Sequence, residues 1–209
     1  MVNSAIFLPA EDDLACLKNL HGHIRVLRRR FESEVLDRRL NQVLIVADDG
    51  TTVCISSDYG DVVFKFECFF LKVFPCARES WSDTVEICEL DEWDSIKCLF
   101  RFEYERPTAN GEMPGTSGQV VGKFTKQSEI PGEATAIGGA LVGIVFQNSV
   151  EECPVLSIAN EDIDCDDPTA IRVSKERQMI ESITNSCESV AIADVPRWVA
   201  EVRRWLDSR

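Results

Sequence analysis

The sequence has little of what most enzymes and metalloproteins use for chemistry. It contains only two histidines, His21 and His23, in 209 residues. This scarcity excludes most Ser-His-Asp triads and multi-histidine metal sites, since each of these needs a histidine in a defined role. A nucleophilic pair of Cys16 with His23 is conceivable on one flank of a helix, but no oxyanion-hole segment is recognisable. The composition therefore favours a protein that is not an enzyme, and we expect no cofactor.

Cysteine pairs with metal-binding or redox spacing are also absent. None of the nine cysteines forms a Cys-x-x-Cys motif, so the usual zinc-ribbon and thioredoxin spacings are missing. An odd number of cysteines, behind a start that does not resemble a signal peptide, argues against a disulfide framework. We therefore expect most cysteines to be reduced and to pack as small apolar side chains.

Long apolar runs are missing as well. The longest ones, at 62–74 and 136–146, fall short of the roughly 20 residues that a membrane-spanning helix needs. Apolar residues at 44% and charged residues at 28% are typical of a folded globular domain. Together these features predict a soluble chain without membrane contact that stays in the cytoplasm.

Positive charge is scarce relative to negative charge. The chain has 22 lysines and arginines against 36 aspartates and glutamates, for a formal net charge of −14. Such a chain repels phosphate backbones, which excludes nucleic acid as a direct partner. The charge balance instead favours a basic protein as the partner.

Two stretches concentrate the negative charge. Residues 79–94 contain seven acids and no base, and so do residues 151–167. The first stretch also holds Trp81 and Trp93. Acids with a few aromatics suit the capture of a basic protein, because charge speeds association and buried aromatics supply binding energy. The alternative is a solubilising surface with both tryptophans turned inward. The candidate partner-binding residues are Glu86, Glu89, Asp91, Glu92, Trp93 and Asp94.

The second acidic stretch resembles the opening of a calcium-binding loop. Asp162, Asp164 and Asp166 stand at alternate positions, as calcium ligands do. The glycine and the glutamate that such a loop needs at its sixth and twelfth positions are replaced by Asp167 and Val173. We interpret the stretch as an exposed acidic turn, with a weak metal site at the three alternating aspartates as the alternative.

Apolar periodicity predicts a helix at each end of the chain. Leucines and other apolar residues at three- and four-residue steps predict an amphipathic helix over about 9–38, with Gly22 as a kink or break. A second amphipathic helix is predicted over 195–207, with Asp194 as its N-cap and Pro196 in its first turn.

Between these helices the pattern is that of strands. An Asp-Gly turn predicts a hairpin of 42–47 with 51–57, and 84–90 with 95–105 resembles a second hairpin. Strands that follow one another this closely leave no room for helical crossovers, which disfavours a parallel sheet. We predict an α+β fold, with a mostly antiparallel sheet and amphipathic helices at the N- and C-terminal ends. Further elements are predicted at 62–74, 119–126, 140–147, 154–159 and 170–174 for strands and at 175–184 for a helix.

The segment 95–105 shows strict alternation. Its apolar residues alternate with mainly charged ones, which predicts one buried face and one wet face. Only Leu99 breaks this pattern. The predicted inward-facing residues are Ile96, Cys98, Phe100, Phe102 and Tyr104.

Glycine and proline crowd residues 106–139, which predicts a long loop. Loops of this length in compact domains are usually functional or mobile. We predict a single domain over residues 1–209. Two β-rich halves on either side of the loop are the alternative.

Our leading functional hypothesis is a non-enzymatic protein that masks a basic target, as an inhibitor or immunity-type protein does. The first alternative is a hydrolase or transferase that uses carboxylates, with or without a divalent ion. The second is a structural subunit that self-associates through the apolar face of the C-terminal helix, with Trp198 and Trp205. The carboxylates of the enzymatic alternative are Asp58, Asp61, Asp162 and Asp164.

Overall fold

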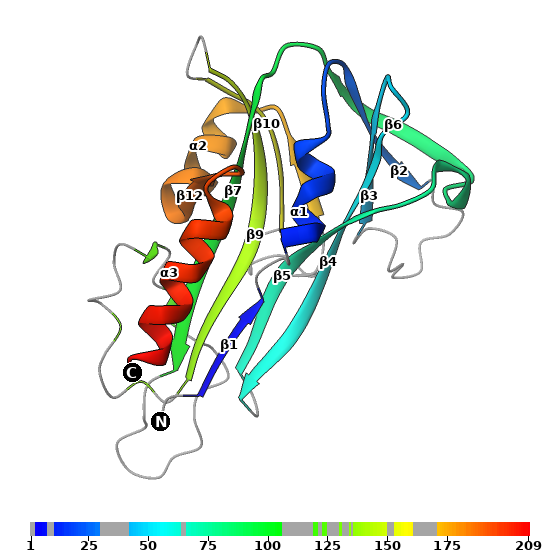
Figure 1. The fold of residues 1–209 in the computed structure, drawn as a ribbon. Helices are drawn as coiled ribbons and strands as arrows, with labels where there is room; N and C mark the ends of the chain where they lie inside the picture. Colours follow the sequence, from blue (N-terminus) through cyan, green and yellow to red (C-terminus); the bar gives the residue numbers. More distant parts are fainter. Residues whose placement is uncertain are drawn as a thin grey trace.

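In the part of the chain that it describes, the computed structural model contains two β-sheets and three α-helices (Figure 1). The residues that it describes are 3–7, 11–29, 42–63, 66–105, 119–120, 123–124, 130, 134, 136–149, 153–160 and 171–209. Nearly all strand pairs in this part of the chain are antiparallel, so the predicted α+β class with a mostly antiparallel sheet is confirmed. The exception is β1 (Asn3–Phe7), which pairs in parallel with β9 (Ala136–Asn148).

The first sheet combines strands from both ends of the chain. Its strand order is β11-β10-β9-β7-β12, with β1 added on β9 and β8 on β7. The bounds of these strands are β7 Ser95–Glu105, β8 Gln119–Val120, β10 Cys153–Asn160, β11 Ile171–Ser174 and β12 Glu188–Ala191. Strands before and after the glycine-rich stretch therefore hydrogen-bond directly to each other in one sheet.

The second sheet is built from consecutive strands and has the order β5-β4-β3-β2-β6. Its strands are β2 Ile24–Arg29, β3 Gln42–Ala47, β4 Thr52–Val63, β5 Phe66–Pro75 and β6 Thr84–Leu90. The predicted β3–β4 hairpin is confirmed, and its turn uses Gly50 at a φ of +88°, a conformation that favours glycine. After β5 the chain passes through the short helix η2 (Arg78–Ser80) and returns as β6 at the opposite edge. On the way, Trp81 packs over Leu27 and Leu44 of the sheet.

The predicted second hairpin, of 84–90 with 95–105, is wrong, although both strands exist. β6 pairs with β2 in the second sheet, whereas β7 pairs with β9 and β12 in the first. The four residues between them cross from one sheet to the other instead of folding back. Trp93 anchors this crossing, because its ring packs edge-on against Phe146 at 5.0 Å and its Nε1 donates a hydrogen bond to the Gly22 carbonyl at 2.8 Å.

The long N-terminal helix predicted over 9–38 is also wrong. Helix α1 spans only Glu11–Lys18, Gly22 adopts a φ of +66°, and the chain then enters β2. Ile24 and Val26 are fully buried on alternate positions of that strand. The three- and four-residue spacing that predicted a helix therefore also fits a short helix followed by a strand. Residues 30–41 lie outside the described part of the chain.

Helices cover both faces of the first sheet. Leu14 and Leu17 of α1, together with α3 (Val195–Asp207), pack on one face and share a core with the second sheet. Helix α2 (Arg177–Ser186) covers the other face (Figure 1), where Ile180 packs with Leu99 of β7. The apolar members of the β7 alternation are buried as predicted, from Ile96 through Tyr104.

The face of β7 that was predicted to be wet is covered. Leu99 is fully buried beside Ile180 of α2, and Glu103 is only 6% exposed. Arg101 forms an ion pair with Glu103 at 3.0 Å. Burial raises the pKa of the Glu103 carboxyl, and Arg101 opposes that shift. The wrong prediction arises because alternation along one strand does not reveal a helix that packs on its polar side.

Helix α3 has the predicted bounds, with Pro196 in its first turn. Asp194 occupies the N-cap position, but its side chain makes no capping hydrogen bond. Trp198 stacks on Phe100 with ring centroids 4.2 Å apart, and Trp205 packs edge-on against Phe124 at 5.5 Å. The apolar face proposed for self-association is therefore already packed against the chain itself.

The glycine-rich loop is shorter than predicted at its C-terminal end. Strand β9 begins at Ala136, so Gly139 is part of the sheet rather than of the loop. A Cβ at Gly139 would lie 2.8 Å from the Phe102 ring, which explains why the strand has glycine there. Of the strand predicted over 119–126, the structure describes β8 at 119–120, whereas Lys123 and Phe124 are not in a strand. Residues 106–118, 121–122 and 125–126 lie outside the described part of the chain.

Candidate functional site

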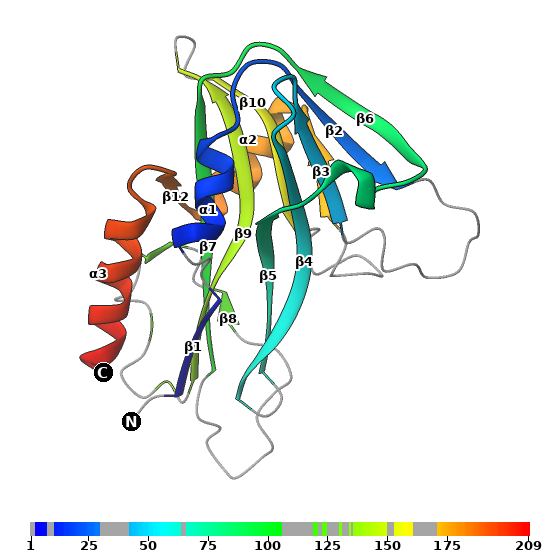
Figure 2. The ribbon, with the colours of Figure 1, turned by 45° about the vertical axis from the view of Figure 1, so that its right-hand side comes forward.

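Four of the predicted partner-binding acids lie along β6 and the segment that follows it. Glu86 and Glu89 belong to β6, and Asp91 and Glu92 come directly after it. All four side chains are exposed. Strand β6 is the last strand of the second sheet, so these carboxylates lie at an edge of the molecule (Figure 2).

Sheet register brings three carboxylates together around His23, which directly precedes β2. Ile24 pairs with Ala47 of β3 on one side and with Leu90 of β6 on the other. The next residues along those neighbouring strands, Asp48 and Asp91, therefore flank His23. The structure thus explains from strand pairing alone why a histidine and acids far apart in the sequence meet.

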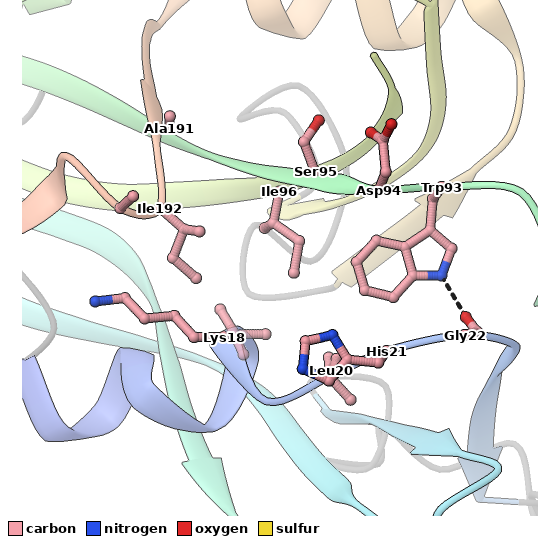
Figure 3. Close-up of a pocket in the computed structure, with 12 residues that line it drawn as sticks. Lys18, Leu20, His21, Gly22, Trp93, Asp94, Ser95, Ile96, Ala191 and Ile192 are labelled. Atoms are coloured by element: carbon pink, nitrogen blue, oxygen red, sulfur yellow. Dashed lines mark hydrogen bonds between the residues drawn. The ribbon is translucent and has the colours of Figure 1, made fainter. Parts of the chain in front are cut away.

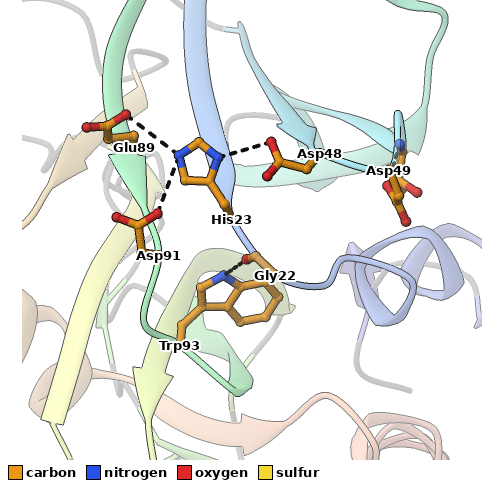
Figure 4. A network of polar contacts seen from close by, with 8 residues as sticks. Gly22, His23, Asp48, Asp49, Glu89, Asp91 and Trp93 are labelled. Atoms are coloured by element: carbon orange, nitrogen blue, oxygen red, sulfur yellow. Dashed lines mark hydrogen bonds and ion pairs between the residues drawn. The ribbon is translucent and has the colours of Figure 1, made fainter.

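The contacts of His23 are short (Figure 4). Its Nδ1 lies 3.1 Å from Oδ1 of Asp48, and its Nε2 lies 3.6 Å from Oε2 of Glu89 and 3.7 Å from Oδ1 of Asp91. The hydrogen bond with Asp48 raises the pKa of His23 above its ordinary value of 6.5, with further support from Asp91 and Glu89 and some opposition from desolvation. Three carboxylates face one imidazole, so the group stays negative even when His23 is protonated.

The other two predicted residues serve the fold. Trp93 is half-buried and held by Phe146 and Gly22, as described above. The Asp94 carboxylate accepts a hydrogen bond from the Ser149 main-chain N–H at 2.9 Å and another from its hydroxyl. These bonds, led by that of the hydroxyl, lower the pKa of Asp94. Both side chains thus hold the crossing between the sheets; Trp93 is half-buried, and Asp94 is exposed but engaged with Ser149.

Sequence reasoning missed Asp48 and His23. Asp48 lies in the turn predicted between 42–47 and 51–57, and the helix predicted over 9–38 carries His23 beside Cys16. In the structure Cys16 lies on α1 and His23 lies beyond the end of that helix, engaged by carboxylates. No local signal identifies this cluster, because it depends on which strands become neighbours.

We call the surface formed by Asp48, Glu86, Glu89, Asp91 and Glu92 the acidic edge. Basic side chains border it. Arg25, Arg28 and Arg29 of β2 lie opposite Glu89, Val85 and Thr84 in the β2–β6 register, and the Lys175 amine donates a hydrogen bond to the main-chain oxygen of Glu89. The carboxylates still outnumber the nearby positive groups, so the acidic edge carries net negative charge at neutral pH.

A pocket of about 300 Å³ lies beside the acidic edge (Figure 3). It forms where the α1–β2, β6–β7 and β12–α3 connections meet. Leu20, Ile96 and Ile192 contribute apolar surface, and Lys18 and His21 bring basic side chains. The volume is at the lower end of the range for small-molecule sites. The carboxylate of Asp94, which also lines the pocket, is engaged with Ser149.

Of the four carboxylates of the enzymatic alternative, Asp58 is the one whose side chain the structure describes. Asp58 of β4 pairs with Lys72 on the neighbouring strand β5. Asp61 also belongs to β4, but its side chain lies outside the described residues. No group of three or more metal-ligating side chains suited to an ion occurs where the structure is described. The calcium-like residues Asp162, Asp164 and Asp166 lie outside it.

Four of the described cysteines are not activated nucleophiles. Cys54 and Cys98 are buried and free, and burial raises the pKa of each thiol to about 12. Desolvation also raises the pKa of the half-buried thiols of Cys76 and Cys88. A thiol with a raised pKa stays protonated at neutral pH and reacts slowly. These cysteines therefore act as small apolar side chains.

Comparison with models of known protein families, with curated proteins and with solved structures found no match for this chain. None of the described helices has both the length and the apolar character needed to cross a lipid bilayer. Any functional inference therefore depends on the geometry and the charge of the sites described above.

Proposed function

We propose that this protein binds a basic protein partner through the acidic edge, without performing catalysis. The observation that carries the proposal is a set of exposed carboxylates along β6 and the crossing that follows it, of which Glu89 and Asp91 converge with Asp48 of the β3–β4 turn on His23. Like charges held this close repel one another, and a cationic partner relieves that repulsion. By covering a functional surface of its target, the protein would act as an inhibitor or immunity-type protein.

Two properties of the acidic edge support binding rather than chemistry. Its carboxylates are largely solvent-exposed, with side-chain exposures of 62% for Glu89 and 74% for Asp91. Such groups steer a charged partner and set the association rate, but they lack the burial that tunes a catalytic carboxylate. In the part of the chain that is described, the His23 ring contacts the carboxylates of Asp48, Glu89 and Asp91 rather than a hydroxyl or a thiol.

A charge-reversal pair tests the proposal. Glu86→Lys with Glu92→Lys changes the acidic edge but leaves the acids that contact His23 in place. The matched control is Glu201→Lys with Asp207→Lys, which makes the same change of net charge on exposed positions of α3. Helix α3 lies on the opposite side of the molecule from β6 in both ribbon views (Figures 1 and 2).

The protein that co-purifies with the tagged chain is identified, purified and titrated against each variant by calorimetry. We expect the acidic-edge variant to weaken binding about tenfold or more and the α3 control to change it by no more than about twofold. Binding should also weaken as salt is raised. Equal affinities for the two double variants, or a partner without a basic surface, would refute the proposal.

A further inference from the structure

The outer edge of β6 is an open strand edge in the described structure. Strand β6 has β2 on one side and no strand on the other among the residues that the structure describes. An edge strand presents main-chain N–H and C=O groups that another extended chain can use. Lys175 donates to the main-chain oxygen of Glu89, so the chain itself occupies the C-terminal end of this edge. Along Thr84–Cys88 no described strand pairs with this edge, and the Thr84 hydroxyl accepts a hydrogen bond from Arg78 at 3.1 Å.

The side chains of this stretch combine apolar surface with charge. Val85 is 41% exposed and Ile87 is 39% exposed, and these are the large apolar side chains left exposed in the part of the chain described. Glu86 stands between them and is exposed too. An extended partner could cover Val85 and Ile87 while its main chain pairs with β6.

Charge selects the occupant of the edge. A second copy of this chain would bring its own acids, out of a net charge of −14, against Glu86 and Glu89. Acids on an edge strand are a known protection against pairing with identical chains. A segment rich in lysine or arginine meets attraction at the same positions.

We propose that the partner binds by adding an extended basic segment as an additional strand on Thr84–Cys88 of β6. Main-chain hydrogen bonds then supply affinity, Val85 and Ile87 contact apolar side chains of the segment, and the acidic edge selects its basic residues. This inference rests on the proposed function, because it specifies how a basic partner is held.

The test uses the full chain and a blocked peptide of about seven residues in which lysine alternates with valine. The control peptide has the same residues but carries an N-methyl group on every amide, so it keeps the charge and loses its main-chain donors. We expect the unmethylated peptide to bind about tenfold or more tightly than the methylated one. Amide hydrogen exchange should then show new protection within Thr84–Cys88.

Other outcomes separate the two proposals. If both peptides bind equally and the Glu86→Lys, Glu92→Lys variant loses both, strand addition is wrong while the acidic edge still captures cations. If neither peptide binds, or if protection appears outside β6, strand addition is likewise overturned. If the variant binds the peptides as tightly as the wild type, the acidic edge itself is not the binding surface.

Discussion

Truncation of Trp198 is the sharpest test of how α3 is held on the first sheet. Its indole is 9% exposed and stacks on Phe100 at 4.2 Å, with Phe102 and Phe124 close by at 6.0 and 6.1 Å. Trp198→Ala removes this ring from the centre of the helix–sheet contact. The neighbouring aromatic rings are part of the same core, so they cannot all collapse into the space that is left.

The magnitude follows from the buried area. A tryptophan buries up to about 250 Å², and at about 25 cal/mol per Å² this corresponds to roughly 6 kcal/mol as an upper bound. Measured aromatic-to-alanine changes in cores cost about 3–5 kcal/mol, so we expect Trp198→Ala to lower the free energy of unfolding by about 4 kcal/mol. For a chain of this size the corresponding fall in Tm is about 8–16 °C.

A second variant separates ring packing from polarity. Nε1 of Trp198 is buried and has no hydrogen-bond partner within the described structure. A buried donor without a partner costs about 1–3 kcal/mol, so Trp198→Phe removes a penalty while it gives up part of the contact area. We expect its free energy of unfolding to lie within about 1 kcal/mol of the wild type.

Urea denaturation followed by far-UV circular dichroism measures both variants. A loss below about 1.5 kcal/mol for Trp198→Ala would show that α3 is not packed on β7 as described. A phenylalanine variant as unstable as the alanine one would show that the indole nitrogen does have a partner.

The remaining predictions concern pH and strand packing. Because the pKa of folded His23 is raised above 6.5, its contribution to stability is fully present below about pH 6.5 and is lost as pH rises through the folded value. Urea denaturation should therefore find that His23→Gln costs more stability at about pH 5.5 than at about pH 8.5. A pH-independent cost would contradict this cluster, and His21→Gln is the control. Gly139→Ala places a Cβ 2.8 Å from the Phe102 ring and should lower the free energy of unfolding by about 1–3 kcal/mol. Adding Phe102→Leu should restore part of the lost Tm in thermal melts. If it restores none, the strain does not arise from contact with the Phe102 ring.

Protonation of His23 also bears on the proposed function. It adds positive charge to the acidic edge, so a basic partner should bind more weakly below the folded pKa than above it. This dependence should be smaller in the His23→Gln variant, which has no imidazole to titrate. The direction is opposite to that of the stability effect, so the two measurements check the same cluster independently.

Local sequence patterns predicted much of the secondary structure. The Asp-Gly turn predicted the β3–β4 hairpin, and helix α3 has the bounds that its apolar stripe and Pro196 indicated. The alternation in β7 identified its inward-facing residues, including Phe100. These successes share a cause, since turn chemistry and periodicity act between residues that are near in sequence.

The predictions were wrong where one sequence pattern fits two structures, or where an element distant in sequence packs on the predicted strand. The apolar spacing from Leu14 to Leu27 fits both a continuous helix and a short helix followed by a strand. Gly22 lies between the helix and the strand that the structure contains. The polar side of β7 is covered by α2, which is far from β7 along the sequence. Neither outcome is encoded in a local window.

The sequence by itself determined the acid excess, the strand-rich composition, the hairpin turn and the amphipathic final helix, because each depends on residue type or local spacing. Only the tertiary structure decided that β6 lies at a sheet edge, that Trp93 and Asp94 hold the crossing between the sheets, and that His23 meets Asp48 and Asp91. The physical reason is that strand neighbours are chosen by long-range pairing and burial, and a one-dimensional pattern does not specify which strands meet.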